Sequence, residues 1–373
     1  MVTVKPVMTR RDLRTFVGLP AQIHERHPQW VPPLALLERI YFDPSRNPSL
    51  RRHGTGMTLA YRDGRAAGRI LTGIHHGYND SKNEKTARFT CLESTDDPEV
   101  VNALLKFAEQ RAHERGMDRV VGPMGLSDSI PEPQGLQVEG FGYNPSLMTN
   151  CNLPYLPELL ASAGYEKEVD YVVYRVPIPD VLPDLYERIH RRVLRKGTYK
   201  ILTPSRRRDL RPYVPAVFRL MNESFRDLYG YMPHEGREEA GFPSMALNIF
   251  DPRFVQLAVY GDDLVGFVLA LPNASAGIRR AGGRLLPLGF LHILREAKQA
   301  RQLDLLFGGI KEEHRGRGID VLMGYRMFTE ARAAGMTHMD SHLELESNTR
   351  IRREMEAMAG RVYKRYRIFQ KTI

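Results

Sequence analysis

The chain has 373 residues, 42% of them hydrophobic, and a formal net charge of +10, which allows two folded domains and excludes a disordered chain. No apolar run approaches the roughly 20 residues that a membrane helix needs, and the N-terminus lacks an apolar core of signal-peptide length, so we expect a cytoplasmic protein without a membrane span. Cys91 and Cys151 are the only cysteines and no CxxC pair exists, which excludes a disulfide scaffold.

The positive charge favours a polyanionic partner, such as a nucleotide cofactor, RNA or an anionic membrane, but a solvated basic surface explains it equally well. No zinc-finger, P-loop or RNP-type motif appears in the sequence. A nucleic-acid partner is therefore not favoured, although the charge does not exclude one.

The first half is predicted to begin with a β-hairpin at 57–72, where YRDGRAAGR places Gly and Asp between apolar segments. The junction at 91–99 is predicted to lead into an amphipathic helix, with Ser94 or Thr95 as its cap. Gly116 is expected to end this helix, and a short strand is expected at 118–123.

A Gly- and Pro-rich segment, 122–144, separates that strand from the next predicted helix. Such loops are often functional, so Ser127, Asp128 and Ser129 are candidates to face a substrate; a plain surface loop is the alternative. Asn152 is predicted to cap a helix that ends at Gly164. A closing strand at 171–176 and a Pro-rich break at 177–183 follow, so we expect domains at 1–180 and 181–373.

The second half is predicted to contain a hairpin at 254–271 and an insertion at 273–302 with a basic turn at 279–284. An apolar strand at 305–310 then runs through a charged loop into a helix that begins at about Ile319. A strand at 337–346, a helix from Asn348 to Gly360 and a last strand at 363–368 complete this half.

Three landmarks recur in the same order in the two halves. Ala112 to Met117 resembles Ala331 to Met336 at the end of a helix; 152–164 aligns without gaps on 348–360; and 171–176 matches 363–368. Each half therefore ends as strand, helix, strand, helix and strand, which predicts a duplicated α/β protein of the α+β type, with a mixed sheet covered by helices.

The segment 305–320 carries the strongest chemical signal. A strand that runs into a loop and a helix N-terminus offers unpaired N–H groups to an anion, and Gly316 and Gly318 let the backbone approach the ligand closely. Arg315 and Arg317 add positive charge. The loop is predicted to hold a pyrophosphate; a plain strand-to-helix turn is the alternative.

Arg315-Gly-Arg-Gly318-Ile319 at this junction resembles the R/Q-x-x-G-x-G/A loop of the GNAT superfamily of N-acyltransferases, whose loop N–H groups hold the pyrophosphate of acetyl-CoA or another acyl-CoA. The resemblance covers about 250–373 and, more weakly, 55–176. It implies two tandem GNAT-like domains, of which the first lacks the loop, because 91–99 is acidic at the equivalent junction. It also implies these cofactor-binding residues: Gly309, Ile310, Arg315, Gly316, Arg317, Gly318, Ile319 and Asn348.

Two positions depart from the family pattern. Asp320 replaces the last Gly or Ala of the loop, and Met355 stands where many members have a Tyr general acid, seven residues after the Asn. Tyr363 is a candidate substitute, and strand packing is its alternative role. Glu344 and Glu346 alternate with leucines, so we expect both carboxylates on one face, with a raised pKa at one of them and Glu346 nearest the thioester.

The sequence thus predicts an acyl-CoA-dependent N-acyltransferase that uses acetyl-CoA or another acyl-CoA, without a metal, and acts on a small-molecule amine or a peptide. His338 and His342 have no metal-binding spacing on a strand. Two alternatives remain: a catalytically inactive GNAT-like binding or regulatory protein, and a Fem-like enzyme that takes aminoacyl groups from tRNA.

Overall fold

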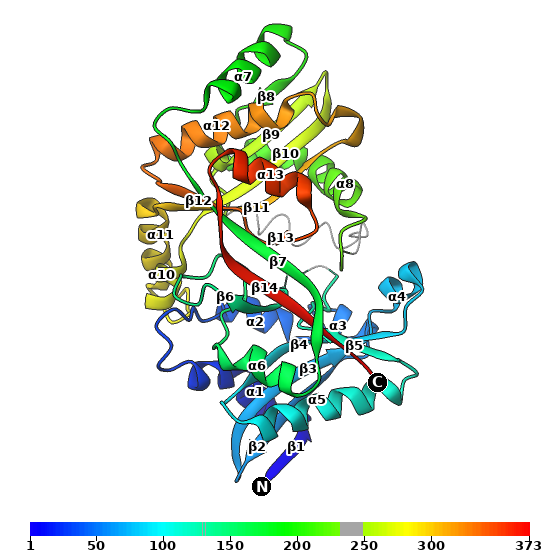
Figure 1. Ribbon diagram of the computed structural model, residues 1–373. Helices are drawn as coiled ribbons and strands as arrows, with labels where there is room; N and C mark the ends of the chain where they lie inside the picture. The colour runs from blue at the N-terminus through cyan, green and yellow to red at the C-terminus, as the bar shows by residue number, and fades with distance from the viewer. Residues whose placement is uncertain (129, 131, 232–248) are drawn as a thin grey trace.

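The computed structural model describes residues 1–128, 130, 132–231 and 249–373 (Figure 1). The elements of the first half are β1 (Val2–Pro6), α1 (Arg10–Ile23), α2 (Ala35–Tyr41), α3 (Ser49–Arg52), β2 (Gly56–Arg62), β3 (Arg65–Gly73), α4 (His76–Lys82), β4 (Thr86–Ser94), α5 (Pro98–His113), β5 (Arg119–Gly122), β6 (Leu136–Glu139), α6 (Tyr155–Ser162) and β7 (Glu166–Pro177).

The elements of the second half are α7 (Asp184–Lys196), β8 (Lys200–Leu202), the 3₁₀ helix η1 (Arg207–Tyr213), α8 (Val214–Phe225), η2 (Pro252–Phe254), β9 (Val255–Tyr260), β10 (Asp263–Pro272), α10 (Ser275–Arg280), α11 (Gly289–Gln299), β11 (Gln302–Ile310), η3 (Glu312–His314), α12 (Ile319–Ala333), β12 (His338–Asp340), β13 (Glu344–Leu345), α13 (Thr349–Ala357) and β14 (Arg361–Thr372).

One mixed sheet joins the two halves, in the order β1-β2-β3-β4-β5-β14-β7-β12-β11-β10-β9-β8. Read inward from each end, the pairings follow the same pattern: three antiparallel pairs, then one parallel pair, β4 with β5 and β11 with β12. The sheet is twisted through the length of the molecule, with helices along its faces (Figure 1). The predicted mixed sheet is confirmed.

The two halves exchange their closing strands at the centre of the sheet. The last strand of the chain, β14, pairs with β5 of the first half as well as with β7, while β7 pairs with β12 of the second half. Phe369 of β14 packs in the first-half core, and Tyr174 of β7 packs in the second-half core. The division of the chain at residue 180 therefore lies between two halves that complete each other's sheets.

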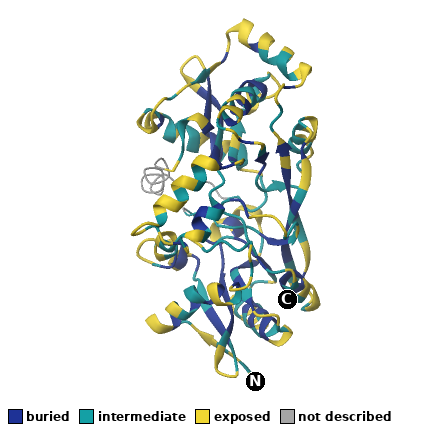
Figure 2. Ribbon diagram, turned by 90° about the vertical axis from the view of Figure 1, so that its left-hand side faces the viewer, coloured by how far each residue is buried: buried dark blue, intermediate teal, exposed yellow. Residues whose placement is uncertain are grey.

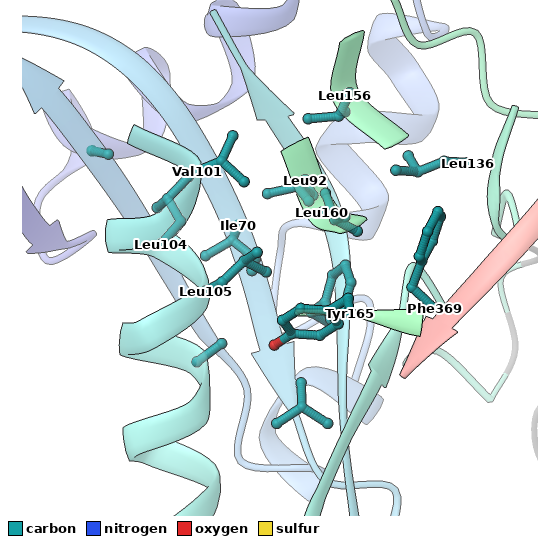
Figure 3. Packing of buried hydrophobic residues seen from close by; sticks show 14 of the residues in the cluster. Ile70, Leu92, Val101, Leu104, Leu105, Leu136, Leu156, Leu160, Tyr165 and Phe369 are labelled. Carbon is teal, nitrogen blue, oxygen red and sulfur yellow. The ribbon is translucent and has the colours of Figure 1, made fainter. Parts of the chain in front are cut away.

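Each half has its own hydrophobic core on the sheet. In the first half, Leu104 and Leu105 of α5 point toward Ile70 of β3, and Phe369 reaches the same cluster from β14 (Figure 3). In the second half, the buried Met327 of α12 packs in the same cluster as Leu303 of β11. Because these side chains follow helical spacing on one face and alternate along the strands, the sequence periodicity produces these layers directly.

The predicted hairpins are confirmed as β2–β3 and β9–β10, but two predicted helix caps are wrong. The cap of α5 is Asp97, whose carboxylate accepts from Glu99 and Val100 N–H, because Pro98 occupies the first helical position. Asn152 does not cap α6, which begins after Pro154. Its side-chain amide instead bonds the N–H and C=O groups of Gln137 in β6.

Candidate active site

The parallel strands β11 and β12 separate after a short paired stretch. Their register covers only 302–304 and 338–340, after which β11 continues along β10 to Ile310. We call the space between 305–310 and 341–345 the strand opening. A parallel pair that diverges in this way leaves backbone groups without a ladder partner, and a ligand can satisfy them.

The predicted single strand over 337–346 is wrong, because β12 ends at Asp340 and β13 begins at Glu344. His342 between them has a left-handed backbone with φ 59°, and Ser341 forms hydrogen bonds with the backbone of Tyr174 in β7. This irregular turn bends the chain away from β11 and forms the far side of the strand opening.

The strand opening leads into a cavity of about 1160 Å³. Its wall is mostly apolar and is formed by β11, α8, α12, α13 and the turn after β12, together with residues of the first half. The residues with most bearing on chemistry are His75, Arg88, Asp128, Ser224, Gly309, Ile310, Arg315, Asp320, Glu344, Asn348 and Glu354. A cavity of this volume and character suits a large, partly apolar ligand.

The loop 311–318 lies at the end of β11 and leads into α12, as the sequence predicted. Gly316 and Gly318 have left-handed backbones with φ 71° and 85°, and Gly318 is the N-cap of α12. Within the described residues, the N–H groups of Gly316, Arg317 and Gly318 donate to no protein acceptor. Ile319 is buried at the first turn of α12. The loop thus presents open donors beside a helix N-terminus, which is an arrangement suited to phosphate oxygens.

Gly309 and Ile310 lie on the β11 side of the cavity, and Asn348 lies on the α13 side. A Cβ atom at Gly309 would come within 2.8 Å of Ser224 Oγ, so glycine allows α8 to approach β11 closely. The Ser224 hydroxyl is buried and has no hydrogen-bond partner in the described structure. Asn348 caps α13 by accepting from Ile351 N–H at 3.4 Å, as predicted.

Three carboxylates line one region of the cavity: Asp320, Glu344 and Glu354. Burial, and then the nearby charge of Glu354, raise the pKa of Glu344 to about 8. Burial and then Asp320 raise the pKa of Glu354 in turn. Sequence reasoning missed Glu354, although it shares a helical face with Asn348, Ile351 and Met355, which also line the cavity.

Glu346 lies in a different environment from Glu344. Its carboxylate accepts from Lys167 Nζ at 2.7 Å and from Arg365 of β14, and these two hydrogen bonds lower its pKa. The expected pairing of Glu344 with Glu346 is therefore wrong, because Glu354 is the carboxylate that contributes to the raised pKa of Glu344. Glu346 is not among the residues that line the cavity.

Tyr363 lies on β14 and donates its hydroxyl to the fully buried Asp340. Burial, followed by Asp340, raises the Tyr363 pKa, and its ring packs edge-on against Tyr143 with centroids 4.9 Å apart. It is not among the cavity-lining residues, whereas Met355 is. Position 355, seven residues after Asn348, therefore brings an apolar thioether to the cavity.

The corresponding strand opening of the first half is filled. After β4 and β5 separate, Met124 N–H donates to Phe89 C=O at 2.8 Å, and a Cβ at Gly122 would lie 2.4 Å from the same oxygen. The insertion 122–144 therefore closes this gap with its own backbone. Ser127 and Asp128 of the insertion line the cavity, and Ser129 lies outside the described residues.

Asp128 joins two histidines that the sequence did not connect. Its Oδ1 lies 3.0 Å from His53 Nε2 and 2.9 Å from His75 Nε2, in a cluster close enough to hold a metal ion. However, His75 Nδ1 accepts from Tyr78 N–H at 3.2 Å, so its Nε2 carries the proton and donates to Asp128. A metal at His75 Nε2 would require the proton on Nδ1 instead. Nδ1 could then no longer accept the hydrogen bond from Tyr78 N–H.

The basic turn at 279–284 and the two cysteines lie outside this arrangement of charged residues. Arg280 pairs with Glu296, and Arg279 donates to Asn144 at 2.7 Å, so the basic turn at 279–284 is partly committed to packing. Burial raises the pKa of Cys91 and of Cys151 to about 12, which keeps both thiols protonated at neutral pH.

No helix among the described residues has both the length and the apolar character to cross a bilayer.

The geometry defines a protein with the tandem GNAT fold, in which two GNAT-like units share one sheet. A tandem GNAT protein from the clavulanic acid biosynthesis pathway superposes with a TM-score of 0.55 at 13% identity, covering 100% of this chain and 98% of that one. A GCN5-related N-acetyltransferase from Sphaerobacter thermophilus superposes with a TM-score of 0.51 at 15% identity, covering 100% and 95%. The fold expected from the resemblance is confirmed.

Two curated proteins are similar to this chain along its whole length. The bacterial ceramide synthase of Caulobacter vibrioides (strain NA1000 / CB15N) is 27% identical over 382 residues, which covers 100% of this chain and 98% of the relative. Protein YghO of Escherichia coli (strain K12) is 24% identical over 377 residues, which covers 99% and 95%. No family model matches the chain.

Proposed function

We propose that this protein is an acyl-CoA-dependent N-acyltransferase that acylates a long-chain amine. The observation that carries the proposal is the set of open N–H donors at 316–318, which lie at the end of a strand opening that leads into a large apolar cavity. This combination supplies an anion site, a channel for an extended chain and a chamber for the acceptor.

The residues present fit an acyl-CoA. The N–H groups of the loop 311–318 and the N-terminus of α12 would hold the pyrophosphate, with Arg315 and Arg317 balancing its charge. The extended arm would lie along Gly309 and Ile310, within reach of the unpartnered Ser224 hydroxyl. Acyl-CoA, when bound, supplies a thioester that an amine can attack.

Six carboxylate residues line the cavity, and the cluster of Asp320, Glu344 and Glu354 among them favours an amine as the second substrate. An ammonium group is attracted to these carboxylates when they are ionised, and Glu344, with a pKa of about 8, can accept its proton in the ionised form. The neutral nitrogen then forms the C–N bond as the C–S bond of the thioester breaks, its second proton passes to the sulfur, and CoA leaves as the thiol. Glu344 thus acts as the general base, in preference to Glu346.

The apolar wall favours a long hydrocarbon chain on at least one substrate. The cavity is lined by apolar side chains from three elements: Leu305 and Phe307 from β11, Val217 and Phe218 from α8, and Met355 from α13. The name of the Caulobacter vibrioides relative refers to ceramide, in which a long-chain amino alcohol carries an N-acyl group. A long-chain amine acceptor agrees with both observations.

Calorimetric titration of CoA, acetyl-CoA and palmitoyl-CoA, followed by a turnover assay with long-chain and short-chain amines, tests the proposal. We expect micromolar binding of CoA species that Gly318→Glu abolishes, and thiol release that depends on a long-chain amine. Binding without turnover of any amine would favour the alternative of a catalytically inactive binding or regulatory protein. Absence of CoA binding would overturn the proposal, and salt-sensitive tRNA binding would then favour the Fem-like alternative.

A further inference from the structure

The insertion between β10 and β11 exposes an unusual number of large apolar side chains. Each is between 41% and 77% exposed, and all lie within nine consecutive residues: Leu286, Leu288, Phe290, Leu291 and Leu294. We call this set the α11 apolar surface. Figure 2 shows the molecule from the side on which α11 lies in Figure 1. Single exposed apolar side chains are common, but five within nine residues indicate a binding surface.

The packing of α11 prevents these side chains from turning inward. The side of α11 that packs against α10 contains Ile293 and Glu296, which are partly buried. A Cβ at Gly277 of α10 would lie 2.6 Å from His292 C=O and 2.9 Å from Ile293 Cα, so the two helices touch at the backbone. The Arg280–Glu296 ion pair adds a second fixed contact. These contacts hold Phe290, Leu291 and Leu294 of α11 on the side that faces solvent.

The charged residues within the stretch 281–301 are almost all positive. Arg284, Arg295, Lys298 and Arg301 are exposed around α11. Glu296 is the one acidic residue in 281–301, a stretch that is described in full, and it is paired with Arg280. Phe and Leu on one side of a short helix with flanking Lys and Arg is the pattern of helices that lie in a membrane interface.

From this surface we propose that α11 docks the protein on an anionic lipid bilayer. Phe290, Leu291 and Leu294 enter the boundary between headgroups and acyl chains, while Arg295 and Lys298 contact lipid phosphates. The charge of the stretch favours an anionic lipid surface, because its exposed charges are positive and Glu296, its one acidic residue, is paired with Arg280. The proposal goes beyond the acyltransferase function and does not rest on it.

Sedimentation of the full-length protein with vesicles tests this proposal. The vesicles are phosphatidylcholine alone and phosphatidylcholine with phosphatidylglycerol. We expect binding to the anionic vesicles that weakens as salt rises, and a loss of more than about tenfold in Leu291→Glu/Leu294→Glu. Leu194→Glu on α7 is the matched control, because Leu194 is 53% exposed against 51% for Leu294, and it is expected to bind like the wild type.

A second variant, Arg295→Glu/Lys298→Glu, replaces two exposed side chains. Its binding to anionic vesicles is expected to fall by more than about tenfold. Each variant should melt within about 2 °C of the wild type, which shows that the fold is kept. Undiminished binding by both double variants, or loss in Leu194→Glu alone, would overturn the proposal. A wild-type dimer that Leu291→Glu/Leu294→Glu splits, without vesicle binding, would assign the surface to a second copy of this chain.

Discussion

Glu344 and Glu346 are two residues apart, but the tertiary structure places their carboxylates in opposite electrostatic environments. Glu344 lies on the cavity wall, where burial and Glu354 raise its pKa to about 8. Glu346 is bound by Lys167 and Arg365, which lower its pKa. A base must lose its proton near the working pH and must reach the substrate, so the environment favours Glu344.

Glu344→Gln is expected to reduce kcat/KM by about 100-fold or more, because an amide cannot accept the ammonium proton. In the wild type, kcat/KM should rise with pH and level off above about pH 8, where Glu344 is ionised. A pH-rate profile with a long-chain amine and an acyl-CoA measures both effects. Glu346→Gln should keep most of the activity; if it abolishes turnover while Glu344→Gln does not, Glu346 is the base.

A stability measurement separates loss of the base from loss of the fold. The pKa of Glu344 is higher in the folded protein than in the unfolded chain, so the folded state holds the extra proton and loses stability as pH rises toward 8. Glu344→Gln removes that cost, and its Tm at pH 9 should exceed that of the wild type by roughly 2–4 °C. A lower Tm at pH 9 would contradict the buried-carboxylate argument.

At the scale of elements, the loop 311–318 depends on α7 as well as on its own glycines. A Cβ at Gly318 would lie 2.7 Å from Val193 Cγ2 and 3.2 Å from Ile189 Cγ2, both on α7. A Cβ at Gly316 would meet nothing within 4 Å, although both residues have left-handed backbones. Both glycines have a left-handed backbone that other residues resist, but only at Gly318 would an added Cβ clash with a neighbouring side chain.

Gly318→Ala should therefore weaken CoA binding by more than about tenfold, because it combines left-handed strain of about 1–2 kcal/mol with a clash that displaces α7 or the start of α12. Gly316→Ala carries the strain without the clash and should lose only a few-fold. Calorimetric titration of CoA into the two variants compares them directly. Equal losses at the two positions would show that the contact with α7 plays no part.

At the scale of the whole molecule, the exchange of β7 and β14 ties the two halves together. Without β14, β5 loses a neighbour and Phe369 leaves the first-half core; without β7, β12 loses its partner and Tyr174 leaves the second-half core. An exposed strand edge beside an incomplete core is prone to misfolding and aggregation.

Chains 1–180 and 181–373, produced separately, are expected to be insoluble or unfolded. When co-expressed with a tag on one chain, they should purify together, because each supplies the other's closing strand. Circular dichroism and gel filtration of the co-purified pair should match the intact protein. A separately produced half that melts cooperatively as a monomer would contradict this view of the fold.

The sequence by itself predicted the duplicated mixed sheet, both hairpins, the loop 311–318 and the start of α12. These features depend on short-range physics: apolar periodicity decides strand or helix, and Gly316 and Gly318 permit a backbone that other residues resist. The cap at Asn348 was predictable for the same reason. The identical signal at Asn152 failed because its amide is used by β6, which the insertion 122–144 brings beside it.

Only the tertiary structure decided the exchange of closing strands, the cavity and the different environments of Glu344 and Glu346. Each depends on groups far apart in the sequence: β14 beside β5, His75 and Asp128 lining the same cavity as Glu344, and Lys167 against Glu346. Desolvation and charge pairing act through space, so a two-residue alternation cannot reveal which carboxylate faces the cavity and which one meets a lysine.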